Sequence, residues 1–207
     1  MTKSLVVNCS LNGKINKDLL AAVEKFSACT VVNFGDISVN YHVGKDINAV
    51  VISGSAARIV NPSDRAQFEG VERLIKSCSL PLLGICFGHQ LLCWAFGAEV
   101  DSLTKQVLNR FEDVNLVQYD EIFSGFKEGQ TILLAENHYD YVLKDSLESA
   151  GFALLADSDS CEVEAVKHKT KPFYGVQFHP ERTAIKNQTN TEGHTVIENF
   201  YTHIVKR

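Results

Sequence analysis

The sequence predicts an α/β fold with a mostly parallel central sheet, helices on both faces, and an antiparallel hairpin in its C-terminal half. In the first half, short and continuously apolar segments alternate with helix-length amphipathic segments, a pattern typical of buried parallel strands and their crossover helices. In the second half, strand-like segments follow one another with few helices between them, which favours antiparallel pairing.

In the first half, each element is predicted from its apolar spacing and its terminal residues. Asn61 as N-cap and Pro62 at the first helical position predict the start of one helix, and Gly97 predicts the end of another. The expected strands are 5–7, 30–34, 49–52 and 81–85, and the expected helices are 17–26, 62–77 and 88–96.

In the second half, Lys169-Thr170-Lys171 separates two strand-like segments and predicts the turn of a hairpin. The expected strands are 107–118, 131–135, 152–156, 162–168 and 172–178, and an amphipathic helix is expected at 195–205. Because no repeat, low-complexity segment or linker interrupts this pattern, we expect a single domain over residues 1–207.

Composition excludes several classes of protein. The net charge of −5 offers no basic surface for nucleic acid or an anionic membrane, and no apolar run approaches the length of a membrane span. The N-terminus has no signal-peptide pattern, so we expect a cytoplasmic protein with free thiols. The six cysteines form no C-x-x-C pair or ligand-spaced cluster, so we expect no metal and no other cofactor.

One cysteine stands in a distinctive setting. Gly84-Ile85-Cys86-Phe87-Gly88 joins a predicted strand to a predicted helix, as in the tight elbow that presents a nucleophile at the carboxyl edge of an α/β sheet. The flanking glycines fit a turn with no room for side chains. The following helix N-terminus favours a thiolate and supplies backbone N–H donors. Cys86 is therefore the candidate nucleophile, whereas Cys93 is expected to be structural.

A thiol nucleophile needs a base, and the base needs a group that orients it. His179 ends a buried strand, Pro180 prevents the strand from continuing, and Glu181 follows. We therefore expect His179 to be the base and Glu181 to orient it. His89, in the first turn of the elbow helix, is expected to pack or cap. The remaining histidines outside residues 136–140 are expected to be solvated: His42, His168, His194 and His203.

Two blocks, Gly84 to Leu92 and Gly175 to Glu181, resemble the signature blocks of class I glutamine amidotransferases in content, order and separation. The resemblance extends over nearly the whole chain. It implies a flavodoxin-like three-layer fold and a reaction in which Cys86 attacks the amide of glutamine. His179 would then protonate the leaving ammonia, and water would hydrolyse the γ-glutamyl thioester.

The resemblance also implies a substrate site. The backbone N–H of Phe87 and one from the loop 52–56, at Ser55, would form the oxyanion hole. The residues implied to bind glutamine are Gly54, Gln90, Asn137, Tyr139 and Asp140, the last three from a second substrate loop at 136–140. The chain departs from the family where Ser55-Ala56-Ala57 follow Gly54, because the family usually has further glycine or proline there. Serine resists a positive φ, so a flip of this loop should be more costly.

Within the family, Asp120 to Gly125 and Asp157 to Val166 resemble the glutaminase subunit of two-subunit GMP synthetases. The chain contains no phosphate-binding glycine loop, so that assignment implies a separate ATP-dependent synthetase as partner. Two alternatives stay open: a stand-alone γ-glutamyl peptidase or hydrolase of the same superfamily, and a catalytically silent regulatory homologue. The segment 182–193 is expected to be an exposed loop beside the active site, either a partner contact or a solvated excursion.

Overall fold

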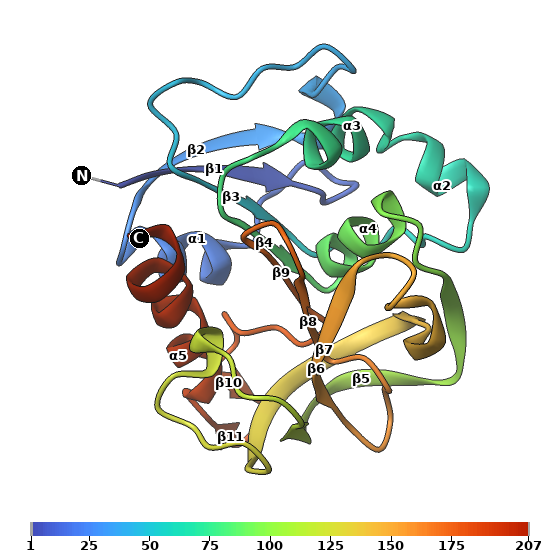
Figure 1. The fold of residues 1–207 in the computed structure, drawn as a ribbon, viewed down its shortest axis with the longest axis vertical. Coiled ribbons are helices and arrows are strands. Elements are labelled where there is room, and N and C mark those ends of the chain that lie inside the picture. Colours follow the sequence, from blue (N-terminus) through green and yellow to red (C-terminus); the bar gives the residue numbers. More distant parts are fainter. Residues whose placement is uncertain (1, 207) are drawn as a thin grey trace.

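The computed structural model describes residues 2–206, and a nine-stranded sheet runs through the molecule (Figure 1). Its strand order is β2-β1-β3-β4-β9-β8-β7-β5-β6. The strands are β1 (Lys3–Asn8), β2 (Ala28–Asn33), β3 (Ala49–Ile52), β4 (Leu82–Ile85), β5 (Val100–Leu116), β6 (Thr131–Val142), β7 (Phe152–Asp157), β8 (Ala165–His168) and β9 (Phe173–Val176).

The first five strands of this order pair in parallel. Their order, 2-1-3-4 followed by the next parallel strand, is that of a flavodoxin-like sheet, which places a ligand crevice at the carboxyl ends of the strands. From β9 onward the pairing is antiparallel, beginning with the predicted β8–β9 hairpin. The predicted α/β fold is therefore confirmed.

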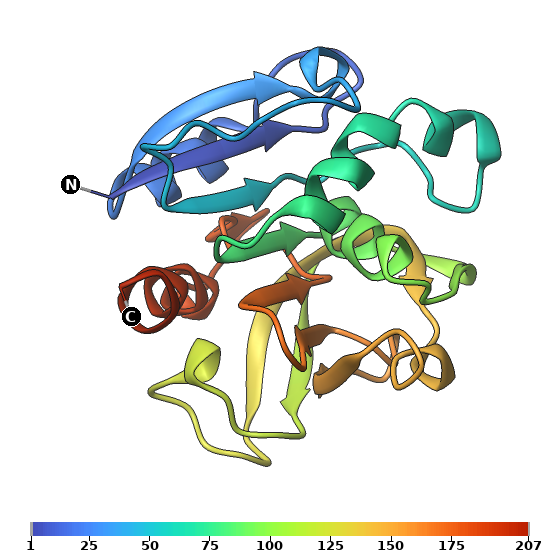
Figure 2. The ribbon, with the colours of Figure 1, turned by 45° about the horizontal axis from the view of Figure 1, so that its top comes forward.

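Helices cover both faces of the parallel half, and two apolar clusters separate the layers (Figure 2). One face packs against α3 and α4 through Val71, Leu74, Leu91 and Leu92. The other packs against α1 and α5, and includes Leu19 and Val196. The helices are α1 (Lys17–Glu24), α2 (Pro62–Ala66), α3 (Glu69–Ser77), α4 (Phe87–Ala95) and α5 (Glu192–Asn199), which continues as a π-helical turn over Phe200–Val205.

The helix predicted over 62–77 is wrong in one respect, because it is two helices. Asn61 caps α2 as expected, accepting a hydrogen bond from the backbone N–H of Ser63. The break lies at Phe68, whose backbone is not helical. Its fully buried ring packs against Phe34 and Phe87, with centroids 4.3 and 4.5 Å apart. Packing of this aromatic ring in the core outweighs the local preference for a continuous helix.

The antiparallel half also departs from expectation. Strands β5 and β6 are longer than predicted, and residues 136–140, expected to form a loop, lie within β6. The segment 182–193 is not a plain loop, because it contains the two-stranded hairpin β10 (Ala184–Ile185) and β11 (Gln188–Thr189). Within residues 2–206, no helix has the length and apolar character needed to cross a lipid bilayer.

Candidate active site

Cys86 occupies the predicted sharp turn between β4 and α4. Its backbone adopts φ 52° and ψ −107°, a region that non-glycine residues rarely occupy. A Cβ on Gly84 would lie 2.5 Å from the carbonyl oxygen of Gly88, and a Cβ on Gly88 would lie 2.3 Å from that of Ile52. Both glycines are therefore required by close backbone approach, and the geometry expected of a nucleophile elbow is present.

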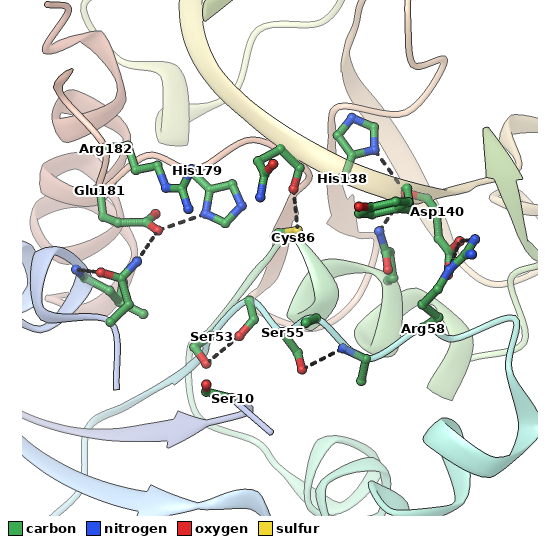
Figure 3. A pocket seen from close by; sticks show the side chains of 18 of the residues that line it. Ser10, Ser53, Ser55, Arg58, Cys86, His138, Asp140, His179, Glu181 and Arg182 are labelled. Carbon is green, nitrogen blue, oxygen red and sulfur yellow. Dashed lines mark hydrogen bonds and ion pairs between the residues drawn. The ribbon is translucent and has the colours of Figure 1, made fainter. Parts of the chain in front are cut away.

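Cys86 opens onto a cavity of about 650 Å³ at the carboxyl ends of the parallel strands (Figure 3). The cavity brings together most of the residues singled out from the sequence. These are Gly54, Ser55, Cys86, Gln90, Asn137, Tyr139, Asp140, His179 and Glu181. Phe87 does not line the cavity, because its ring is buried against Phe68. A role for Phe87 in this site would therefore rest on its backbone alone.

His179 lies between Glu181 and Cys86 (Figure 3). Its Nδ1 is 2.9 Å from Oε1 of Glu181, and the side-chain amide of Asn16 donates a 2.9 Å hydrogen bond to the same oxygen. Nε2 of His179 has no hydrogen-bond partner in the described part of the chain. A Cβ on Gly54 would lie 3.2 Å from Cε1 of His179 and 3.6 Å from Cβ of Cys86. Gly54 thus lies against both side chains.

Opposing effects set the protonation of this pair. Burial by itself lowers the pKa of His179, but the charges of Glu181 and Cys86 outweigh it and raise the pKa to about 10. Burial likewise tends to raise the pKa of Glu181, and the charge of His179 holds it below its usual value. His179 is therefore an imidazolium paired with a carboxylate at neutral pH, able to donate a proton from Nε2.

The predicted substrate-binding residues differ in whether their polar groups already have hydrogen-bond partners within the protein. The Nε2 amide group of Gln90 donates to the backbone carbonyl of Asp140 at 2.7 Å and to Oε1 of Gln177 at 3.0 Å. Gln90 is thus held by the protein through both of its amide protons. The backbone carbonyl of Asn137 lies 3.7 Å from Sγ of Cys86, close enough for a weak thiol contact.

Sequence reasoning missed Arg58, which joins Asp140 in the cavity wall. Nε of Arg58 donates to Oδ1 of Asp140 at 3.0 Å, and Nη2 donates to the hydroxyl of Ser102 at 2.8 Å. Arg58 also forms an ion pair with Asp140, whose other oxygen is buried without a hydrogen-bond partner among the described residues. The available signal was a lone cation two residues after the oxyanion-loop segment.

Residues 52–56, the loop expected to supply an oxyanion-hole donor, do not have a positive φ at Ser55. Within residues 2–206, the non-glycine residues with positive φ are Cys86, Asn109 and Lys186. The hydroxyl of Ser55 accepts a 3.0 Å hydrogen bond from the backbone N–H of Ala57, which closes a tight local turn. A backbone flip at Ser55 would break this bond and force a serine into a disfavoured conformation.

His89 packs in the interior as expected. It is fully buried, and a Cβ on Gly175 would come within 2.4 Å of its Nδ1. Burial lowers the pKa of His89 to about 3, so it is neutral. The expectation that His168 is solvated is wrong, because its ring lies among Phe96, Phe152 and Phe173. The lysines on either side of His168 in the sequence suggested polar surroundings, which led to the wrong expectation.

A family model described as glutamine amidotransferase class-I matches residues 10–204. The chain belongs to the class I glutamine amidotransferase family. Its relatives include one subunit of the glutamine-hydrolysing GMP synthase of Methanothermobacter thermautotrophicus, 42% identical over 127 residues, which are 61% of this chain and 62% of the relative. The corresponding subunit of Methanobrevibacter smithii is 36% identical over 138 residues, 66% of either chain.

Solved structures also resemble the chain. A Thermoplasma acidophilum protein, provisionally named as one of the GMP synthase subunits, is 27% identical with a TM-score of 0.79, over 97% of this chain and 92% of that one. A glutamine amidotransferase of Thermotoga maritima has a TM-score of 0.71 over 87% of this chain and 76% of its own, at 17% identity, and therefore supports the fold alone. The alignments to the Methanothermobacter and Methanobrevibacter proteins span less than two thirds of the lengths of those relatives.

Proposed function

We propose that this chain is a glutaminase that releases ammonia from glutamine for a separate, ATP-dependent GMP synthetase subunit. The observation that carries the proposal is the strained elbow at Cys86, beside a paired His179 and Glu181 in one cavity. Its kinship with GMP synthase subunits supports the choice of partner. The family match over residues 10–204 supports a single domain over residues 1–207. The six free cysteines are compatible with the predicted cytoplasmic location.

The proposed reaction uses a Cys-His-Glu triad. Sγ of Cys86 attacks the side-chain carbonyl carbon of glutamine and forms a tetrahedral intermediate. Backbone N–H groups of Ser55 and Phe87 would stabilise the oxyanion. Nε2 of His179 protonates the amide nitrogen, and the carbon–nitrogen bond breaks to release ammonia and leave a γ-glutamyl thioester. Water, deprotonated by the now neutral His179, adds to the thioester and releases glutamate and the Cys86 thiolate.

Substrate recognition is proposed to rest on opposite charges in the cavity wall. Glutamine carries an ammonium and a carboxylate on its α-carbon. The unpartnered Oδ2 of Asp140 would accept from the ammonium, and the guanidinium of Arg58 would face the carboxylate. Gly54, Gln90, Asn137 and Tyr139 would complete the glutamine site. Because Gln90 already donates both amide protons, it would contribute its carbonyl oxygen and the position of Asp140.

The test compares the chain alone with the chain plus a GMP synthetase subunit, measuring glutamate released from glutamine. We expect slow basal hydrolysis that rises at least about tenfold with the partner, a barrier change of roughly 1.4 kcal/mol. Cys86→Ala should abolish both rates while the circular dichroism spectrum stays unchanged. An electrophilic glutamine analogue should label Cys86 and spare the other five cysteines. Labelling at Cys93 instead would contradict the elbow assignment.

Ser55→Gly tests whether the oxyanion loop restrains the basal rate. The variant loses the hydroxyl bond to Ala57 and gains access to positive φ, so basal hydrolysis should rise and the partner's stimulation should shrink. Fast cleavage of γ-glutamyl peptides by the lone chain, indifferent to a synthetase, would instead establish the stand-alone hydrolase. Glutamine binding without turnover, with or without partner, would establish a silent homologue.

A further inference from the structure

A second group of ionisable side chains lies beside β6, next to the cavity that holds Cys86 and His179. Glu136 and His138 are two residues apart on β6, and Cys161 and Glu164 come from the segment between β7 and β8. Donor atoms of His138, Cys161 and Glu164 all lie within 4.8 Å of one another, and Oε2 of Glu136 is 3.5 Å from Nε2 of His138. Three potential metal ligands from two distant segments therefore converge, and Glu136 lies against one of them, His138.

The cluster is sealed from solvent and poorly satisfied internally. The two glutamates are 0% exposed, and His138 and Cys161 are each 2% exposed. Nε2 of His138 is buried without a hydrogen-bond partner in the described part of the chain. The carboxyl groups of Glu136 and Glu164 lie at hydrogen-bonding distance from each other. Two buried carboxyl groups in contact require a shared proton or a cation.

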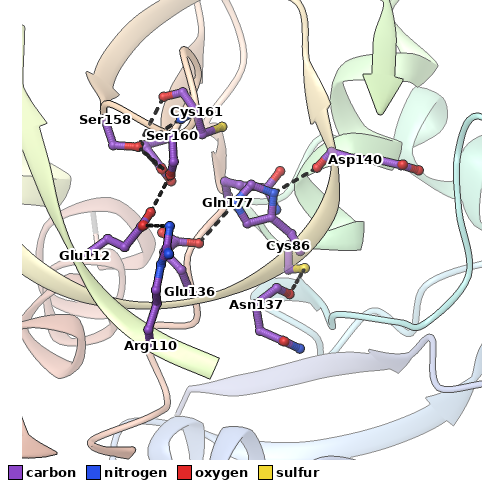
Figure 4. Close-up of polar contacts among 12 residues, drawn as sticks. Cys86, Arg110, Glu112, Glu136, Asn137, Asp140, Ser158, Ser160, Cys161 and Gln177 are labelled. Atoms are coloured by element: carbon purple, nitrogen blue, oxygen red, sulfur yellow. Dashed lines mark hydrogen bonds and ion pairs between the residues drawn. The ribbon is translucent and has the colours of Figure 1, made fainter. Parts of the chain in front are cut away.

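Outer hydrogen bonds aim the donor atoms inward. Nδ1 of His138 is 3.0 Å from the backbone carbonyl of Asp140, an acceptor that places the ring proton on Nδ1 and leaves the lone pair of Nε2 toward the cluster. The hydroxyl of Ser158 donates to Oε1 of Glu164 at 2.7 Å, so Oε2 of that carboxyl is the oxygen left for the cluster. Figure 4 shows the turn from Ser158 to Cys161, where the hydroxyl of Ser160 donates to Glu112, and Glu136 in the same group of polar side chains.

We propose that Glu136, His138, Cys161 and Glu164 form a structural zinc site. One thiolate, one imidazole and two carboxylates are ligands that zinc accepts, whereas thiolate and imidazole disfavour magnesium and calcium. Tetrahedral zinc with its usual bond lengths holds ligand atoms about 3.3–3.8 Å apart. The donor atoms of His138, Cys161 and Glu164 therefore have to approach one another by at most about 1.5 Å, and Glu136 has to turn toward them. Neighbouring Cys and His spacings did not reveal this site, because its ligands lie far apart in the chain.

The site has a structural role because four protein ligands leave no open position on the metal. It ties β6, which carries Glu136 and His138, to the segment that precedes β8. Asn137, between these two ligands, is the residue whose carbonyl approaches Cys86. His138 also lines the 650 Å³ cavity, so the proposed zinc site adjoins the cavity wall.

The test uses the full chain loaded with Co²⁺, which reports a bound thiolate by charge-transfer absorption in the near ultraviolet. We expect stoichiometric uptake with that absorption in the wild type. Cys86→Ala should retain both, because Cys86 is not a ligand of the proposed site. Cys161→Ser should lose the absorption. Zinc content after dialysis, measured by mass spectrometry, should follow the same pattern in protein expressed with zinc.

A stability readout keeps the proposal testable if a ligand variant folds poorly. Zinc should raise the Tm of the wild type and of Cys86→Ala, and should leave the Tm of Glu164→Gln unchanged. Glu164→Gln preserves side-chain volume and relieves carboxyl repulsion, so it is expected to fold. Absence of uptake would overturn the proposal and leave a pair of carboxyls sharing a proton. Uptake that disappears in Cys86→Ala and persists in Cys161→Ser would overturn it by placing the metal at the catalytic cysteine.

Discussion

Gly88→Ala tests the elbow, because the added methyl group would collide with the backbone. The Cβ would lie 2.3 Å from the carbonyl oxygen of Ile52 and 2.9 Å from its carbonyl carbon, whereas ordinary contact begins at 3.4 Å. Relief of this clash requires α4 and the end of β3 to separate by about 1.1 Å, the difference between those distances. Neither backbone can rotate away as a flexible side chain would, so the strain has to be absorbed by the sheet.

The expected cost has two parts. Overpacking of this kind costs about 1–3 kcal/mol of unfolding free energy, which lowers the Tm of a chain of this size by about 2–12 °C. Ile52 leads directly into Ser53 and Gly54, so the same movement displaces the proposed oxyanion loop, residues 52–56, from Cys86. A misplacement of about 1 Å is expected to lower kcat/KM by about 100-fold.

Thermal unfolding and glutamate release measure the two effects separately. Gly35→Ala is the matched control, because a Cβ there meets nothing within 4 Å, and its stability should change by no more than about 0.5 kcal/mol. Gly54→Ala should preserve stability yet lower activity, because its Cβ would approach His179 at 3.2 Å. The reasoning is refuted if Gly88→Ala matches Gly35→Ala in both Tm and kcat/KM.

The remaining predictions concern charge. Because the folded-state pKa of His179 is raised to about 10, the enzyme should keep its active protonation state, and hence its kcat, up to that pH. Glu181→Gln should shift the alkaline limb of the pH profile of kcat toward neutral pH. An unshifted limb would disprove the pairing. By linkage, stability from the protonated His179 is fully present below its ordinary pKa near 6.5 and is lost as pH rises through about 10, so denaturant unfolding should show a smaller loss over that window in Glu181→Gln. Arg58→Gln should raise KM for glutamine at least about tenfold, about 1.4 kcal/mol, with a smaller change in kcat; an unchanged KM would remove Arg58 from the substrate site.

Local patterns were sufficient where a residue's role depends on its neighbours in the chain. Cys86 was identified because a buried strand, two glycines and a helix start specify a tight turn wherever they occur together. His179 was identified because Pro180 ends the strand that carries it. The parallel half was predicted for the same reason, since continuous apolar strands alternating with amphipathic helices can bury their surfaces only in one layered arrangement.

Local patterns failed where distant packing decided the outcome. The helix at 62–77 breaks because the ring of Phe68 is drawn between Phe34 and Phe87. Residues 136–140 extend as a strand rather than a loop because β5 supplies hydrogen-bond partners along that length, with register shifts that no local pattern encodes.

The sequence by itself determined the layered α/β fold, the candidate nucleophile with its histidine and glutamate, and the resemblance that led to the family. The tertiary structure alone decided which polar groups meet across the molecule. Asn16 reaches Glu181 across 165 residues, and Arg58 reaches Asp140 across 82. Cys161 and Glu164 similarly meet His138. Such pairings arise because the parallel sheet gathers the ends of strands from distant parts of the chain at one edge, while β6 brings buried carboxyl groups against a separate turn.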